Sequence, residues 1–244
     1  MRYAVISDIH ANIEALEAVL TDAARRSPDA YLCLGDVVGY GPDPNACVER
    51  VRNLGGVVIA GNHDRGAVGR LPAAAFSSLA RAAIEWTAGE LTEDSRAFLE
   101  ALPDRFETPA YLAVHGSPRL PVEEYIFDLP TALAVFAETE FQMCLAGHTH
   151  IPGVFVRRSN GHLTMETLRS EAALDLATAS RYIVNPGSVG QPRDGDSRAA
   201  YLTFDDQAPR VVLHRVAYPV AATQTKMARR GLPPLLSRRL ASGT

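Results

Sequence analysis

Five short polar blocks in the sequence contain side chains that commonly bind metal ions. Two histidines stand one residue apart in the segment GHTH, residues 147–150, directly after the apolar run FQMCLA. The other blocks are Asp8-Ile9-His10, Gly35-Asp36, Gly61-Asn62-His63-Asp64 and His115, and the five blocks together hold five of the seven histidines. Imidazole and oxygen ligands without a thiolate favour a catalytic pair of metal ions over a structural zinc site. We therefore expect two divalent ions, with Mn²⁺ favoured and Fe, Zn²⁺ or Ni²⁺ as alternatives.

The elements that must position these blocks are predicted strands. The apolar runs YAVIS, AYLCLG and VVIAG each precede a block, and they alternate with helical spacing over 13–26 and 46–54. Asn12 is a suitable N-cap for the first of these helices. Strand and helix in alternation predict parallel strands in an α/β arrangement. Because ligands bind where the carboxyl ends of such strands meet, we expect the five blocks to converge.

Residue spacing supports the same site. In an extended segment, residues i and i+2 point the same way, so Asp8 and His10 are expected to reach one ion. By the same argument, both histidines of GHTH are expected to reach one centre. A carboxylate such as that of Asp36 can bridge two cations with its two oxygens. Two ions about 3.5–4 Å apart form a clamp that suits in-line displacement at phosphorus.

The remaining pattern predicts further helices and a second set of strands. Two helices are expected within 73–102, with Thr92 as a cap of the second, and another over 131–138. Beyond Pro152 the chain changes to short strands separated by turn residues. These strands predict a mostly antiparallel sheet that packs on the first. The two histidines outside the blocks, His162 and His214, fall within these predicted strands and are expected to be structural.

The last 26 residues differ in charge from the rest of the chain. The segment 219–244 contains no acidic residue but several basic ones. Charge runs are usually solvated, so we expect a loosely held basic tail outside a domain formed by residues 1–218. The alternative is an anchor for a partner or an anionic surface.

Composition restricts the compartment and the partners. The 244 residues are 47% hydrophobic and 21% charged, and a net charge of −4 gives no reason to expect nucleic acid as a partner. The three cysteines, Cys33, Cys47 and Cys144, match no zinc or disulfide pattern, so a reducing compartment is expected. A signal peptide is not expected, and no stretch is apolar enough to span a bilayer. These observations predict a cytoplasmic protein without a membrane partner; they leave its oligomeric state open.

In order and composition, the five blocks resemble the complete motif set of the calcineurin-like metallophosphoesterases. The resemblance covers roughly residues 1–215. The loop VGYGPDP at 38–44 and the segments HGSPR at 115–119 and NPGS at 185–188 are similar to the smaller bacterial phosphodiesterase branch of that superfamily. The fold that this implies is an α/β (α+β layered) protein in which two packed mixed β-sheets form a sandwich flanked by helices.

The resemblance also implies a role for each matching residue. Seven side chains would be metal ligands: Asp8, His10 and His150 on one ion, Asn62, His115 and His148 on the other, and Asp36 between them. His63 would contact the phosphate and protonate the leaving oxygen. Asp64 would orient this region by hydrogen bonds.

The implied activity is metal-dependent hydrolysis of small phosphodiesters or nucleotides. A hydroxide held between the ions would attack phosphorus in line with the leaving group, without a covalent phospho-enzyme. A phosphomonoesterase or a dinucleoside polyphosphate hydrolase is the alternative within this class, since fold does not settle substrate. A non-catalytic scaffold of the same fold is the alternative from another class, and the intact ligand set with His63 argues against it. A Walker-type nucleotide binder is excluded because the only lysine is Lys226 and no GK[ST] motif occurs.

Substrate contacts are predicted beside the blocks. Tyr40 follows the Asp36 loop, and Arg119 follows His115, where a guanidinium could pair with a phosphate in a bidentate manner. The alternative for both is packing within their own loops. Tyr125 and Asn185 are weaker candidates, and the turn that begins at Asn185 is expected mainly to support the metal histidines.

Overall fold

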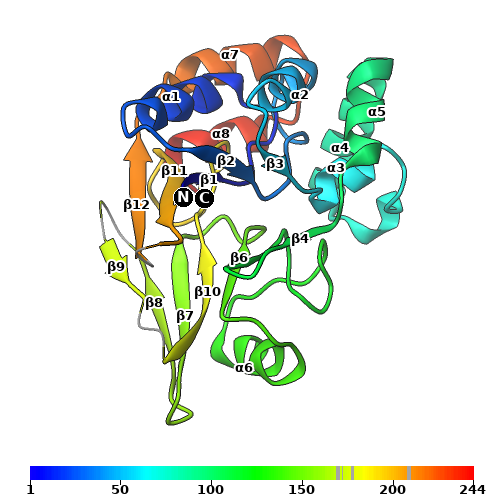
Figure 1. Cartoon of the computed structure of the whole chain (residues 1–244). Helices are drawn as coiled ribbons and strands as arrows, with labels where there is room; N and C mark the ends of the chain where they lie inside the picture. The colour runs from blue at the N-terminus through cyan, green and yellow to red at the C-terminus, as the bar shows by residue number, and fades with distance from the viewer. Residues whose placement is uncertain (169–170, 172, 177–178, 208–209) are drawn as a thin grey trace.

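The computed structural model describes residues 1–168, 171, 173–176, 179–207 and 210–244. Two mixed sheets of six strands each are flanked by helices (Figure 1). The strands of the first sheet are, in spatial order, β3 (Val57–Val58), β2 (Ala30–Cys33), β1 (Arg2–Ile6), β11 (Ala199–Asp205), β12 (Arg210–Val216) and β9 (Ala173–Asp175). Those of the second are β4 (Arg105–Glu107), β5 (Leu112–Val114), β6 (Met143–Ala146), β10 (Ser180–Asn185), β7 (Gly153–Arg158) and β8 (Leu163–Thr167). The predicted fold class is confirmed.

An apolar core lies between the two sheets. Leu32 and Leu202 of the first sheet meet Leu145 and Val184 of the second in one buried cluster. Helices cover the outer faces because each has an apolar stripe at helical spacing. In Figure 1, α1 (Ile13–Ala24), α2 (Pro44–Arg52) and the C-terminal helices lie over the first sheet, and α6 (Leu129–Glu138) lies at the opposite end of the molecule.

Parallel pairing brings the ends of the block-bearing strands together. β1 pairs with β2 and β2 with β3 in parallel, and β5 pairs in parallel with β6 in the other sheet. Backbone hydrogen bonds continue past the strand ends, from Asp8 N to Gly35 O at 3.0 Å and from Gly147 N to His115 O at 2.8 Å. The polar blocks therefore leave the two sheets side by side, as the strand pattern predicts.

The expectation of a separate antiparallel C-terminal sheet is wrong. β11 pairs antiparallel with β1, so β11 and β12 complete the first sheet, whereas β7, β8 and β10 join β6 in the second. The apolar pattern of a short strand shows that it is buried, but it does not identify its partner. Here the central strands β1 and β6 each bury both edges by pairing with a strand from the C-terminal half.

All of the predicted helices are present. Within 73–102, α4 (Ser78–Glu90) and α5 (Glu93–Ala101) follow a short 3₁₀ turn at Ala73–Ala75. Asn12 and Thr92 both accept a hydrogen bond from the first turn of the helix that they cap, as expected.

The two histidines outside the polar blocks have different settings. His214 lies in β12, where its ring contacts Thr203 Oγ1 at 3.0 Å and Glu171 at 3.1 Å, a structural role as predicted. His162 precedes β8 instead of lying within it, and it is exposed. The three cysteines are free and buried, as befits small apolar residues.

The C-terminal segment is a packed helical hairpin, so the expectation of a loosely held tail is wrong. Helices α7 (Val220–Arg229) and α8 (Pro234–Ser242) bury Met227, Leu236 and Leu240 in a cluster with Tyr40. Lys226 forms ion pairs with Glu14 at 2.5 Å and Asp43 at 2.8 Å. The apolar residues of the two helices recur at helical spacing and form one face of the hairpin. This face is buried against the rest of the fold, so the segment is packed although it is basic. Among the helices that the structure describes, none has the length and apolar character to cross a membrane.

Leu236→Ala is expected to lower the free energy of unfolding by about 2–5 kcal/mol, because a fully buried leucine leaves a cavity when it is shortened. Urea denaturation followed by circular dichroism measures this loss. Leu235→Ala is the matched control, since Leu235 is 52% exposed and its removal is expected to change stability by less than about 0.5 kcal/mol. Equal effects at the two positions would contradict a packed hairpin.

Candidate metal centre

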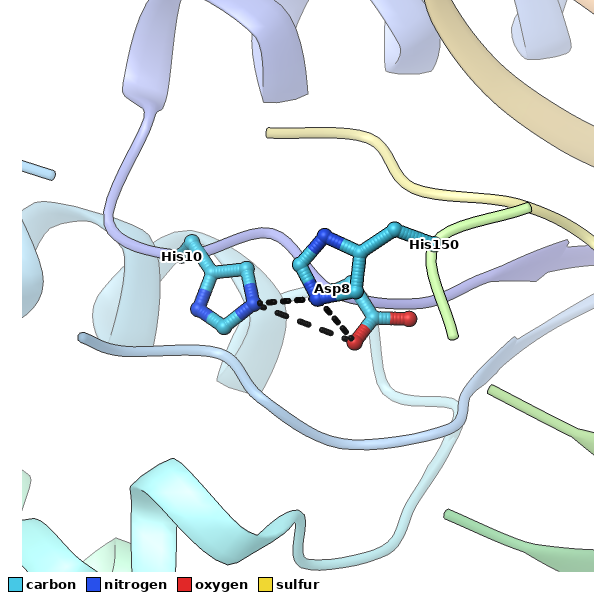
Figure 2. Close-up of side chains that lie close together, drawn as sticks. All are labelled: Asp8, His10 and His150. Atoms are coloured by element: carbon cyan, nitrogen blue, oxygen red, sulfur yellow. Dashed lines mark hydrogen bonds and ion pairs between the residues drawn. The ribbon is translucent and has the colours of Figure 1, made fainter. Parts of the chain in front are cut away.

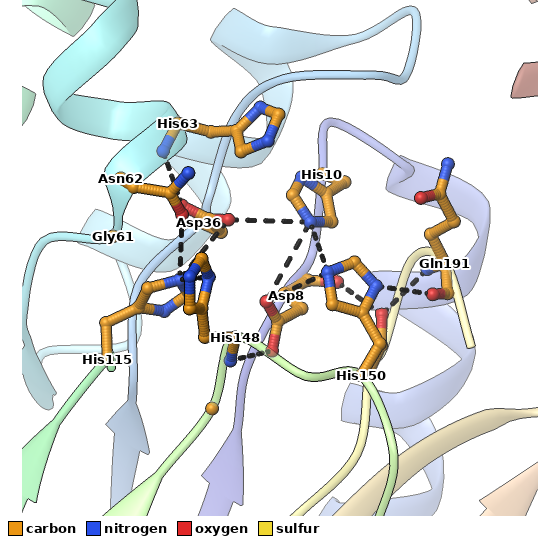
Figure 3. Close-up of polar contacts among 12 residues, drawn as sticks. Asp8, His10, Asp36, Gly61, Asn62, His63, His115, His148, His150 and Gln191 are labelled. Atoms are coloured by element: carbon orange, nitrogen blue, oxygen red, sulfur yellow. Dashed lines mark hydrogen bonds and ion pairs between the residues drawn. The ribbon is translucent and has the colours of Figure 1, made fainter. Parts of the chain in front are cut away.

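The polar blocks converge in one buried cluster at the edge where the block-bearing strands of the two sheets end (Figure 3). Asp8 and His10 follow β1, and Asp36 follows β2. Asn62 and His63 begin α3 (Asn62–Ala67), His115 follows β5, and His148 and His150 follow β6. Each of these eight side chains belongs to a buried residue, with an exposed fraction of 8% or less. The structure thus brings together all seven predicted metal ligands and His63.

The first half of the centre consists of Asp8, His10 and His150 (Figure 2). The Nε2 atoms of His10 and His150 lie 3.1 Å apart, and Asp8 Oδ1 lies 3.3 Å from Nε2 of His150. Each Nδ1 faces a carbonyl oxygen, that of Val38 for His10 at 3.2 Å and that of Gln191 for His150 at 2.6 Å. Since a carbonyl only accepts, each Nδ1 carries the proton and each neutral ring turns an Nε2 lone pair toward the same point.

The second half repeats this arrangement around His115. Its Nε2 lies 3.1 Å from Asn62 Oδ1 and 3.1 Å from His148 Nδ1. The opposite ring nitrogens face carbonyl oxygens, that of Leu34 at 2.8 Å from His115 Nδ1 and that of Glu123 at 3.2 Å from His148 Nε2. An amide oxygen and two imidazole lone pairs therefore face a common point when both rings are neutral.

Asp36 lies between the two halves. Its Oδ2 is 3.6 Å from Nε2 of His10 and 3.4 Å from Nε2 of His115, while its Oδ1 accepts a 2.8 Å hydrogen bond from the backbone N of His63. The carboxylate is thus fixed by the start of α3 and faces both histidine pairs. This position permits a bridge between two cations.

Burial and mutual charge set the protonation of the cluster. Burial lowers the pKa of His10, His148 and His150 well below the usual value, so these rings are neutral near pH 7. Burial would raise the pKa of Asp36, but the charges of His115, His63 and His10 and the hydrogen bond with His115 together outweigh it and hold this pKa well below its usual value. Burial also lowers the pKa of His115, yet the charge and hydrogen bond of Asp36, with the charge of Asp8 and the hydrogen bond to Leu34 O, together raise it to about 9.

The donor set fits two divalent cations. Asp8 Oδ1 is buried without a hydrogen-bond partner, and burial raises the pKa of this carboxyl to about 6. An unpartnered carboxylate oxygen and opposed imidazole lone pairs are unfavourable in a buried site unless a cation lies among them. His63, which also lies within 4.8 Å of the His10 and Asp36 ligand atoms, leaves its Nδ1 without a partner.

Left-handed backbone turns aim the ligands, which corrects the extended-chain argument made from their spacing. The φ angles are 54° for Asp8, 49° for His10, 67° for His148 and 62° for His150. Asp36 and Tyr40 are also left-handed. Such conformations are costly for residues other than glycine, and they cluster at functional sites. The strand ends therefore curl around the centre, and the two histidines of GHTH diverge to its two halves.

Glycines next to the ligands permit the close approach of neighbouring chain segments. A Cβ at Gly61 would lie 2.1 Å from Oδ1 of Asp36 and 2.4 Å from its backbone N. One at Gly147 would lie 2.1 Å from Oγ of Ser7. The glycines before Asn62 and His148 thus meet a steric requirement of the site, as their positions in the sequence suggest.

Of the predicted accessory residues, Asp64, Tyr40 and Tyr125 lie at the centre. Asp64 accepts hydrogen bonds from Val38 N at 3.1 Å and Gly61 N at 2.9 Å, so it connects the loops that carry Asp36 and Asn62. The Tyr40 ring packs against His10 and His63, with centroids 4.6 and 4.3 Å away. Tyr125 stacks on His148 at 3.6 Å. Tyr40, Asn62, His63, Tyr125 and His148 line a cavity of about 200 Å³.

Arg119 and Asn185 have other roles. The guanidinium of Arg119 is bound by Glu124 and by Glu138, the latter at 2.8 Å, so the structure uses its charge locally and does not direct it to the centre. Asn185 donates hydrogen bonds to Gly147 O at 2.6 Å and Thr149 Oγ1 at 3.0 Å, which supports the histidine loop as expected.

Two residues near the centre were missed by the sequence analysis. Gln191 and Arg193 follow the NPGS turn, and both contact His150, through Gln191 O and through a 3.4 Å hydrogen bond from Arg193 N to His150 O. The sequence does contain a feature that could have identified them, the glycine-containing segment NPGSVG at 185–190. It follows the predicted strand that ends at Asn185, and this strand ends at the same edge of the sheets as the polar blocks.

Comparison with known proteins agrees with this geometry. The model of the calcineurin-like phosphoesterase superfamily domain matches residues 1–207. The chain is 37% identical over 246 residues to "Uncharacterized protein MJ0912" of Methanocaldococcus jannaschii, covering 98% of this chain and 97% of that protein. It is 43% identical to a metallophosphoesterase from Sphaerobacter thermophilus, with a TM-score of 0.89 and coverage of 100% and 99% of the two chains. Hypothetical protein PH1004 from Pyrococcus horikoshii shares the fold, with a TM-score of 0.79, 22% identity and coverage of 100% and 98%. The chain therefore belongs to the calcineurin-like phosphoesterase superfamily.

Proposed function

We propose that this protein is a phosphoesterase dependent on two divalent metal ions, which hydrolyses small phosphodiesters or nucleotides. The observation that carries the proposal is the position of Asp36, whose Oδ2 faces the histidines of both halves of the centre. Asp8, His10 and His150 would hold one ion, and Asn62, His115 and His148 the other. We favour manganese because the ligands are nitrogen and oxygen atoms without sulfur.

When bound, the two ions supply a nucleophilic water at neutral pH and neutralise charge on the phosphoryl oxygens. The residues of the chain fix where that chemistry occurs. Carbonyl oxygens fix the orientation of the ligand histidines, so the rings need not turn before metal binding, and His115 would release its extra proton when an ion binds. Asp64 accepts hydrogen bonds from Val38 N and Gly61 N, and these bonds fix the loop that carries Asp36 relative to the loop that carries Asn62.

His63 is the proposed contact with the substrate phosphate. Burial lowers its pKa to about 4, so the ring is neutral near pH 7 and can donate one N–H to a phosphoryl oxygen. A bound phosphoryl group would raise this pKa, since a nearby negative charge favours the imidazolium. His63 could then pass its proton to the leaving oxygen. Its ring is held between Tyr40 and Phe76, with centroids 4.3 and 5.5 Å away.

The cavity beside the centre favours a small substrate. Its volume of about 200 Å³ is below the usual range of about 300–1,000 Å³ for ligand pockets. Its wall is both polar, at Asn62 and His63, and aromatic, at Tyr40, Phe76 and Tyr125. A small phosphoester suits such a wall better than a dinucleoside polyphosphate does, and the choice between a diester and a monoester is left to the assay below.

The test is metal-dependent hydrolysis of two reporter esters. Metal-stripped protein receives Mn²⁺, Fe²⁺, Zn²⁺, Ni²⁺ or Mg²⁺ singly and is assayed with bis-p-nitrophenyl phosphate and p-nitrophenyl phosphate. We expect no turnover without metal, restoration by Mn²⁺ and a higher kcat/KM for the diester. Hydrolysis of the monoester alone would replace the diesterase with a phosphomonoesterase. Binding of two ions without turnover of either ester would favour the non-catalytic scaffold.

A further inference from the structure

The loop after β10 places Arg193 against the first half of the metal centre. Val189 N donates to Ser7 O at 3.0 Å and Gly190 N donates to Asp8 O at 2.9 Å, so the loop is tied to the strand that ends in Asp8. A Cβ at Gly190 would lie 1.8 Å from Ile9 O, so glycine is required for this approach. The next residues contact His150 from the same side. The backbone of the loop that carries Arg193 is therefore fixed by hydrogen bonds to two predicted metal ligands, Asp8 and His150.

The guanidinium of Arg193 is positioned by polar and aromatic neighbours. Its Nη2 donates to Gln191 Oε1 at 3.1 Å, and its Cζ lies 5.8 Å from the centroid of the Tyr40 ring. Tyr40 in turn packs against His10 and His63. The positive charge of Arg193 acts on the metal centre. Burial lowers the pKa of His150 well below its usual value, and repulsion by the guanidinium of Arg193 lowers this pKa further.

Arg193 lacks the compensation that other arginines in this fold receive. Its Nε is buried without a hydrogen-bond partner, and no carboxylate of the described residues forms an ion pair with it. By contrast, Arg65 pairs with Asp104 at 2.6 Å and Arg119 with Glu138 at 2.8 Å. A partly buried cation next to a site for two more cations is unfavourable unless an anion joins them.

We propose that Arg193 binds a phosphoryl oxygen of the substrate, and that Gln191 and Tyr40 position its guanidinium for this contact. The inference rests on the proposed function, because it assigns a residue to the same site. The guanidinium fork matches phosphate geometry, and charge-assisted hydrogen bonds of this kind are about twice as strong as neutral ones. The bound phosphoryl group would supply the anionic partner in direct contact that Arg193 does not have among the described residues.

The experiment compares Arg193→Gln and Arg193→Lys with Arg198→Gln. Arg198 is the matched control because it lies five positions further along and pairs with Asp196 at the surface. Metal content per chain, melting temperature, calorimetric affinity for inorganic phosphate and kcat/KM for bis-p-nitrophenyl phosphate are measured on Mn²⁺-loaded protein. We expect Arg193→Gln to weaken phosphate binding and lower kcat/KM by about 100-fold each. Metal content and melting temperature should match those of Arg198→Gln.

Two further readings separate substrate binding from a structural role. Arg193→Lys keeps the charge without the fork, so it should retain part of the phosphate affinity, and added guanidinium ions should restore part of the activity of Arg193→Gln. Loss of metal or of thermal stability in Arg193→Gln, or wild-type affinity for phosphate, would overturn the inference. If wild-type protein hydrolyses no ester with any metal, the proposed function fails instead, and the phosphate titration still decides the role of Arg193.

Discussion

Asp36→Asn is expected to abolish ester hydrolysis and to leave fewer than two metal ions per chain. The substitution removes the only charge that faces both halves of the centre within the predicted ligand set, since Asp36 Oδ2 lies 3.6 Å from His10 Nε2 and 3.4 Å from His115 Nε2. Asparagine has nearly the same shape and still accepts the hydrogen bond from His63 N, so the loop should persist. A bound ion contributes several kcal/mol to transition-state stabilisation, so kcat/KM should fall by at least about 1,000-fold.

Metal analysis and kinetics on the same sample measure both effects. Asp175→Asn is the control, because the side chain of Asp175 is 89% exposed and pairs only weakly with Arg210 at 3.6 Å. It should bind two ions and turn over substrate at the wild-type rate. An Asp36→Asn protein that binds two ions with unchanged affinity would show that Asp36 is not shared between them.

The location of the site could be predicted from the sequence because it depends on local patterns. A buried strand is recognised in the sequence as a run of apolar residues. The residues that directly follow this run must lie at the carboxyl end of the strand. Asp8, Asp36, His115 and His148 could therefore be placed at one edge of the sheets before their partners were known. Convergence of the parallel strand ends then follows from the fold class.

The detailed geometry of the ligands depended on backbone conformation, which the sequence did not indicate. Left-handed φ angles at Asp8, His10, His148 and His150 direct the side chains. Aspartate and histidine adopt this conformation more often than most residues do, but residue type alone does not specify it. The predicted extended backbone would have turned both histidines of GHTH to the same side of the chain, whereas the structure directs them to the two halves of one centre. Tertiary contacts, such as the hydrogen bonds from both histidine rings to carbonyl oxygens, maintain the strained turns.

Long-range pairing explains the remaining errors. The partner of β11 is β1, almost two hundred residues earlier, and nothing in either strand specifies the other. The basic residues of 219–244 suggested solvation, although Met227, Leu236 and Leu240 bury one face of the hairpin near Tyr40. Arg119 was named with Tyr40 as a candidate substrate contact because it follows His115 in sequence, and only the structure showed that two glutamates already bind it.

His63→Ala is expected to lower kcat for an alkyl phosphodiester by about 1,000-fold while two metal ions remain bound, because general acid catalysis contributes about 10²–10⁴-fold. The His63 ring lies beside the centre, with its centroid 4.8 Å from that of the His10 ring. His63 is nevertheless not one of the seven residues proposed to bind the metal ions. Its loss should therefore spare metal affinity. Steady-state kinetics, with metal content from the same preparation, measures the two effects separately.

The controls for His63 test competing roles. His162→Ala removes an exposed histidine and should leave kcat unchanged. A protein that loses metal together with activity would make His63 a ligand, as its cluster with His10 and Asp36 allows. Leaving groups distinguish proton donation from simple phosphate contact: p-nitrophenolate departs without a proton, whereas an alkoxide requires one. If His63 is the acid, His63→Ala should impair alkyl esters far more than nitrophenyl esters, and equal impairment of both would restrict His63 to binding the phosphoryl oxygen.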